Sequence, residues 1–154
     1  MSARILMLIG SESDRSVFEE ARPWLAEFGI DGELIVSSAH RNPKRTAELA
    51  EGARAAGYSA IICGAGMAAH LAGVVASHST LPVIGVPLAG SALNGMDALL
   101  STVQMPAGIP VATTAIGKAG VINAVLLVAR MLSLGDAKMV ERLDAFMARG
   151  ARLA

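Results

Sequence analysis

The sequence predicts an α/β fold in which a five-stranded parallel sheet lies between two layers of helices. Short, continuous apolar segments alternate along the chain with longer segments whose apolar residues recur at helical spacing. A strand that is apolar at every position must be covered on both faces, which is typical of parallel sheets flanked by helices. Glycine or proline marks most of the junctions between segments, and these residues commonly end one element or begin the next.

The first half of the chain is predicted to contain three strands and two helices. The strands are short apolar segments at residues 4–9, 32–37 and 59–63. The helices that connect them are amphipathic and lie at residues 13–28 and 43–56. Gly29 and Gly57 follow these helices, and glycine commonly ends a helix because it adopts the left-handed conformation without steric cost. Pro43 suits the first position of the second helix, with Asn42 as its cap.

The second half continues this alternation and adds a C-terminal helix. Its strands are predicted at residues 82–86 and 110–114, and its helices at residues 68–77, 95–104, 119–134 and 137–149. Five strand–helix units of this size predict a single domain over residues 1–154. The expected architecture is a flavodoxin-like three-layer αβα sandwich with a five-stranded parallel sheet, followed by the C-terminal helix.

The composition argues against several classes of protein. The 13 basic and 13 acidic side chains balance, so the chain lacks the electrostatic signature of nucleic-acid binding and any charged block that would hold it on a membrane. The single cysteine, Cys63, lies in an apolar segment and is expected to be buried and unreactive. Without a disulfide or a recognisable secretory signal, the expected location is the cytoplasm.

The predicted helix at residues 119–134 is apolar on nearly every side. It is shorter than the roughly 20 residues that span a bilayer, yet a helix without a polar face must be covered all round. We therefore expect a homo-oligomer in which another subunit packs on this helix. The alternative is a central helix within a monomer.

The loop after the second strand contains a histidine and an arginine side by side. Residues 38–43 read Ser-Ala-His-Arg-Asn-Pro, so His40 and Arg41 precede the next helix. Open α/β sheets bind their ligands at the carboxyl ends of their strands. Because an imidazole transfers protons near pH 7 and a guanidinium binds phosphate, this loop predicts a proton-transfer group beside an anion-binding group.

The loops after the first and third strands also contain candidate ligand-binding residues. The first loop offers Ser11, Ser13 and Asp14 at the start of a helix, where hydroxyls and helix amides favour an anion. The alternative is that these side chains only cap the helix. The third loop, residues 64–70, has small residues that let a planar ligand approach the backbone. Its His70 either faces that ligand or is structural.

The remaining candidate residues are expected to have structural roles, and several common functional motifs are absent. His78 is expected at the surface or as a helix cap, and Asp97 is expected to cap the helix that begins beside it. The sequence has no P-loop, no complete dinucleotide fingerprint, no nucleophile elbow and no His or Cys spacing typical of a metal site.

Four motifs occur in one order along most of the chain: G-S-x-S-D at 10–14, S-A-H-R-x-P at 38–43, G-A-G-x-A-A-H-L at 64–71 and V-Q-M-P-x-G-I-P-V at 103–111. Together they closely resemble the class I, or mutase, type of the phosphoribosylaminoimidazole carboxylase catalytic subunit family. These are the N5-carboxyaminoimidazole ribonucleotide mutases of de novo purine (IMP) biosynthesis.

The resemblance implies an activity and an assembly. The carboxylate would move from the exocyclic nitrogen to C4 of the aminoimidazole ring, giving 4-carboxy-5-aminoimidazole ribonucleotide. Breakdown of the carbamate to CO2 would precede recarboxylation, and no metal, biotin or ATP is expected. The family also implies a homo-octamer with active sites near subunit interfaces.

The resemblance assigns roles to individual residues as well. His40 matches the general acid and base of the family. The family's phosphate and ribose contacts carry over to Ser11, Asp14 and Arg41. The other expected site residues are the pocket walls Ser13, Ser38 and Ala39 and the loop residues Gly66, Ala68 and His70, which close over the base and carboxylate.

Three positions depart from the pattern of the family: Met67 replaces a glycine, Ala72 a proline and Asn42 a threonine. Three alternative functions are a class II carboxylase that uses free CO2, an enzyme that carboxylates another heteroaromatic nucleotide, and a non-catalytic nucleotide-binding module. The Ala-His-Leu sequence at 69–71 and the arginine at position 41 argue against the class II type.

Overall fold

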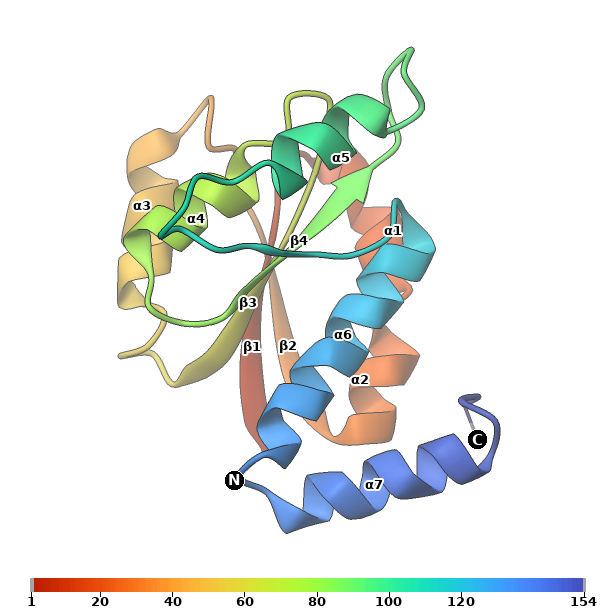
Figure 1. The fold of residues 1–154 in the computed structure, drawn as a ribbon. Helices are drawn as coiled ribbons and strands as arrows, with labels where there is room; N and C mark the ends of the chain where they lie inside the picture. The colour runs from red at the N-terminus through yellow and green to blue at the C-terminus, as the bar shows by residue number, and fades with distance from the viewer. Residues whose placement is uncertain (1, 154) are drawn as a thin grey trace.

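A parallel sheet forms the centre of the molecule (Figure 1). The computed structural model describes residues 2–153. The strands of its sheet are β1 (Ala3–Ile9), β2 (Ile30–Val36), β3 (Tyr58–Gly66), β4 (Val83–Leu88) and β5 (Ala112–Thr113). Their order is β2-β1-β3-β4-β5, and neighbouring strands are parallel. Strand addition reverses direction between β1 and β3, and doubly wound folds bind ligands at such a switch point.

Helices cover both faces of the sheet (Figure 1). One layer contains α1 (Arg15–Glu19), α2 (Arg22–Phe28), α6 (Lys118–Ser133) and α7 (Ala137–Ala148). The other layer contains α3 (Pro43–Gly52), α4 (Leu71–His78) and α5 (Met96–Val103). The C-terminal helix α7 packs on α6 and α2. The predicted flavodoxin-like three-layer αβα sandwich with a C-terminal helix is therefore confirmed.

Alternate residues of β1 belong to two different buried clusters. Ile5 and Ile9 pack in the cluster that includes side chains of α2, α6 and α7, whereas Leu6 and Leu8 pack in the cluster on the side of α3 and α4. This double coverage explains why the strand is apolar at every position. Cys63 lies in the second cluster and is buried as predicted, and its burial raises the pKa of the thiol.

The prediction of one continuous helix at residues 13–28 is wrong. The structure has a 3-10 turn, η1 (Glu12–Asp14), followed by the separate helices α1 and α2. The break precedes Pro23, which occupies the first turn of α2. Proline has no N–H to donate, and its ring collides with the carbonyl four residues earlier. That carbonyl belongs to Glu19, where α1 ends.

The helix predicted at residues 68–77 begins later, at Leu71. The reason is that β3 continues through the glycine-containing segment, whose residues 64–66 pair with residues 86–88 of β4. A Cβ on Gly64 would collide with the ring of Phe18, so the close approach of strand and helix requires glycine there.

Other boundaries differ by smaller amounts. The helix predicted at residues 43–56 ends at Gly52, and the strand predicted at 110–114 is reduced to two residues. Asp97 does not cap α5, because Gly95 occupies the cap position in a left-handed conformation and Asp97 lies inside the first turn. Among the described residues, Oδ1 of Asp97 is buried without a hydrogen-bond partner.

Helix α6 is covered on one face. Its buried side chains include Val121, Val125 and Val128. On the outer face, Leu126 and Leu127 line an open depression. That another subunit packs on this outer face stays a prediction. Over residues 2–153, no helix combines the length and the apolar character needed to cross a bilayer.

Candidate active site

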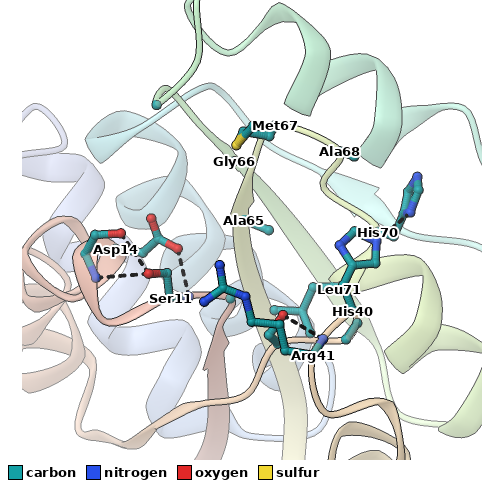
Figure 2. Close-up of a pocket in the computed structure, with 15 residues that line it drawn as sticks. Ser11, Asp14, His40, Arg41, Ala65, Gly66, Met67, Ala68, His70 and Leu71 are labelled. Atoms are coloured by element: carbon teal, nitrogen blue, oxygen red, sulfur yellow. Dashed lines mark hydrogen bonds between the residues drawn. The ribbon is translucent and has the colours of Figure 1, made fainter.

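A pocket of about 270 Å³ lies where the loops after β1, β2 and β3 meet (Figure 2). All of the residues expected to bind substrate or transfer protons line it. They are Ser11, Ser13, Asp14, Ser38, Ala39, His40, Arg41, Gly66, Ala68 and His70. Three loops that are far apart in the sequence converge here because the carboxyl ends of parallel strands lie at one edge of the sheet.

The first loop is held by a reciprocal capping arrangement. The backbone N–H of Ser13 donates to Oγ of Ser11 at 3.3 Å, and the N–H of Ser11 donates to Oδ2 of Asp14 at 3.1 Å. These residues therefore cap η1 and also line the pocket. Binding of an anion by this loop stays a prediction. Burial raises the pKa of the Asp14 carboxyl, although its bond to the Ser11 N–H acts in the opposite direction.

Hydrogen bonds join the second loop to α3. Ser38 accepts the N–H of Arg41 through Oγ at 3.3 Å and the N–H of Asn42 through its carbonyl at 2.8 Å. Asn42 then caps α3 by accepting the N–H of Arg45. The guanidinium of Arg41 extends toward Ser11 and Asp14 (Figure 2). Arg41 is thus directed at the part of the pocket lined by the Ser11 hydroxyl and the Asp14 carboxyl.

The third loop forms the opposite rim of the pocket. Gly66 is the last residue of β3, and Met67 follows it in the left-handed conformation, with φ of 54° and 63% of its surface exposed. His70 immediately precedes α4 rather than lying in its first turn. Its Nδ1 lies 2.9 Å from Nε2 of His40, which places the two imidazoles in direct contact.

Sequence reasoning missed some residues that line the pocket. Gly10, Ala65, Met67 and Leu71 also line it, and all four belong to or adjoin the motifs already singled out. Gly90, from the loop after β4, lines it too. Glycine carries no side-chain chemistry, so only a prediction of loop positions in three dimensions finds it.

Other polar groups lie elsewhere. His78, at the end of α4, pairs through Nδ1 with Glu51 of α3 at 2.8 Å and does not line the pocket.

Within residues 2–153, no three His, Cys, Asp or Glu side chains come together as a metal site. The pocket thus combines a guanidinium, a partly buried carboxyl, serine hydroxyls and two imidazoles, which suits an anionic substrate that exchanges a proton.

Known proteins match this chain over nearly its whole length. The model of the AIR carboxylase family matches residues 4–152. The N5-carboxyaminoimidazole ribonucleotide mutase of Brucella melitensis is 49% identical over 94% of this chain and 89% of that protein. The enzyme of the same name from Bacillus subtilis is 51% identical, with the same coverage.

A solved structure agrees in fold over nearly the same span. The crystal structure of Treponema denticola PurE has a TM-score of 0.87 at 27% identity, covering 97% of this chain and 92% of that one. A family match over almost the whole length, relatives that share about half of its residues and a matching fold all point the same way. The chain belongs to the AIR carboxylase family.

Proposed function

We propose that this protein is an N5-carboxyaminoimidazole ribonucleotide mutase, acting in the cytoplasm in de novo purine biosynthesis. Relatives of that name at about 50% identity over 94% of the chain support the activity. The observation that carries the proposal is the position of His40, which lines one pocket together with the anion-binding candidates Ser11 and Arg41. A proton-transfer group and a phosphate anchor on two sides of one pocket fit a ribonucleotide with a reactive base.

Each part of the pocket has a role in this proposal. Arg41 and Ser11 bind the phosphate, and Asp14 binds a ribose hydroxyl. The walls beside them are Ser13, Ser38 and Ala39, and the segment that closes over the base and carboxylate contains Gly66, Ala68 and His70. The direction of the Arg41 guanidinium, toward Ser11 and Asp14, supports this arrangement (Figure 2).

The reaction uses His40 twice. Protonated His40 donates a proton to the exocyclic nitrogen as the bond between this nitrogen and the carboxyl carbon breaks. The aminoimidazole ribonucleotide and CO2 are then both in the pocket. C4 forms a bond to CO2, and neutral His40 accepts the proton that leaves C4 as the ring regains aromaticity. Substrate and product are isomers, and CO2 held beside C4 is recaptured without diffusion.

The proposed assembly is a homo-octamer with pockets near the subunit interfaces. An exposed apolar stripe supports self-association: Leu93, Met96, Leu100 and Val103 run along α5 and the loop before it. The same loop contributes Gly90 to the pocket. A subunit that covers this stripe would therefore lie beside the site.

The activity is tested by supplying two sets of reactants. The carbamate ribonucleotide is expected to give the C4-carboxylated product rapidly, whereas aminoimidazole ribonucleotide with bicarbonate gives it slowly. His40→Asn is expected to lower kcat by about 10²–10⁴-fold, because general acid–base catalysis contributes rate factors of this size. His78→Asn is the matched control, since its imidazole lies outside the pocket.

Other outcomes identify the alternatives. Rapid product from aminoimidazole ribonucleotide and CO2 alone would indicate the class II carboxylase. Nucleotide binding without turnover, unchanged by His40→Asn, would indicate a binding module. Turnover of a different heteroaromatic nucleotide in place of the carbamate would indicate the related carboxylating enzyme.

A further inference from the structure

Two of the three histidines of the chain are hydrogen-bonded to each other in the wall of the pocket (Figure 2). Nε2 of His40 and Nδ1 of His70 are 2.9 Å apart, and the rings are nearly perpendicular, at 86°. The residues come from different loops, after β2 and before α4. This geometry suits an N–H···N hydrogen bond rather than stacking of the two rings.

The bond limits the charge that the pair holds. A neutral imidazole has one protonated ring nitrogen and one acceptor nitrogen, whereas an imidazolium has a proton on both. If both rings were imidazolium, both facing nitrogens would carry protons and the bond would be lost. While it exists, only the ring that donates is able to be cationic, and the accepting ring is neutral.

The position of His70 favours His40 as the donor. His70 directly precedes α4, an eight-residue helix, and within the described chain its side chain makes no capping bond there. The positive end of a helix dipole disfavours a cation at this position. The other charged groups that line the pocket are Asp14 and Arg41. The guanidinium of Arg41 is directed toward the first loop, away from the two rings (Figure 2).

We propose that His70 is a positioning residue for proton transfer, whose Nδ1 accepts the Nε2–H of His40 and leaves Nδ1 of His40 as the atom that exchanges the proton. This inference rests on the proposed function. Protonated and neutral His40 both keep the proton on Nε2, so the same hydrogen bond holds the ring through carbamate cleavage and through removal of the C4 proton. Only the proton on Nδ1 leaves and returns.

Two substitutions at position 70 distinguish a role of His70 in orienting His40 from a role in packing or in substrate binding. His70→Leu removes the acceptor and keeps an apolar side chain of similar size. His70→Asn keeps an acceptor oxygen near the place of Nδ1. For a metal-bound histidine, loss of the partner that orients the ring commonly lowers metal affinity or activity by about 10–100-fold, and an effect of the same order is expected here. We expect His70→Leu to lower kcat by about this factor with KM within about threefold, and His70→Asn to recover most of the loss.

Nuclear magnetic resonance of the protein labelled with ¹⁵N-histidine tests the bond without turnover. The three imidazoles are assigned with His40→Asn, His70→Asn and His78→Asn. We expect neutral His40 to show protonated Nε2 and a scalar coupling across the N–H···N bond to Nδ1 of His70. In His70→Leu, His40 is expected to become a mixture of tautomers, while His78→Asn leaves its signals unchanged.

Three results would overturn the inference. One is a wild-type His40 protonated on Nδ1 with Nε2 accepting. Another is a raised KM with unchanged kcat in His70→Leu, which would mean that His70 only contacts substrate. The third is a kcat for His70→Asn as low as that of His70→Leu. A wild-type enzyme that fails to turn over the carbamate would instead contradict the proposed function, and the spectra would still report the hydrogen bond.

Discussion

At the scale of single residues, Met67 combines a conformation suited to glycine with a side chain that is mostly exposed. Its φ of 54° lies in the left-handed region, and 63% of its surface is accessible. Such a conformation costs a non-glycine residue about 1 kcal/mol or more. The side chain therefore contributes little packing that would repay this strain, although it lines the pocket.

The expected effect of Met67→Gly on stability is small. Relief of strain is offset by the greater freedom of glycine in the unfolded chain, so the free energy of unfolding should change by less than about 1 kcal/mol. We also expect kcat/KM to stay within about tenfold of wild type. Met67→Val should lower stability, since a β-branched side chain fits the left-handed region poorly. Urea denaturation measures both variants.

The control for Met67 is Ala151→Gly, which also places glycine at a left-handed position, with φ of 58°, near the C-terminal end of the described chain. It should change stability to a similar extent without any effect on activity. A large loss of activity in Met67→Gly alone would instead assign the methionine side chain a role in holding the substrate.

At the scale of elements, the contact between β3 and α1 determines how closely the first and third loops approach. A Cβ on Gly64 would overlap the fully buried ring of Phe18. Gly64→Ala is therefore expected to lower the free energy of unfolding by about 1–3 kcal/mol, the usual cost of overpacking a core. Chemical denaturation followed by circular dichroism provides the measurement.

Gly52→Ala provides the comparison for this prediction. Gly52 ends α3, and a Cβ added to it would meet none of the described residues within 4 Å. Alanine there should leave stability unchanged or raise it slightly, because alanine favours helix more than glycine does. Equal effects of the two substitutions would contradict the close contact between β3 and α1.

The elements also show what sequence patterns capture. All five strands are predictable, because apolar runs identify buried parallel strands. The break before Pro23 escapes the pattern because an amphipathic sequence continues across it, although the proline itself signals an interruption. The prediction for Asp97 is wrong because a left-handed Gly95 takes the cap position, a backbone conformation that residue preferences alone do not determine.

The sequence predicts which loops form the candidate site but not the contact between its two histidines. Its three loops follow from strand order, since polar residues after neighbouring strands meet at one edge of a parallel sheet. The bond between His40 and His70 joins residues 30 positions apart and has no local sequence pattern. The bond depends on where β2 and β3 end relative to one another along the sheet, and only the three-dimensional structure shows this.

At the scale of the whole molecule, the exposed apolar stripe on α5 predicts how the proposed octamer depends on single residues. Leu100 is 52% exposed in the isolated chain. Leu100→Lys would place a charge in an apolar interface and is expected to shift the protein to smaller species at equal concentration, while its circular dichroism stays unchanged. Sedimentation velocity distinguishes these states.

Val140→Lys is the matched substitution on α7, where the side chain is 41% exposed. It should leave the assembly as large as in the wild type. A monomeric wild-type protein, or dissociation caused by Val140→Lys alone, would contradict an interface on α5.

The convergence of distant segments on one pocket couples ligand occupancy to the integrity of the domain. The walls come from segments within residues 10–14, 38–41 and 65–71 and from Gly90, so no partly unfolded chain retains a complete binding surface. A bound nucleotide at about 100 times its dissociation constant adds about 2.7 kcal/mol to the native state. In cells that contain much substrate, the bound nucleotide would therefore protect the protein from proteolysis. Depletion of the substrate would shorten the lifetime of the protein.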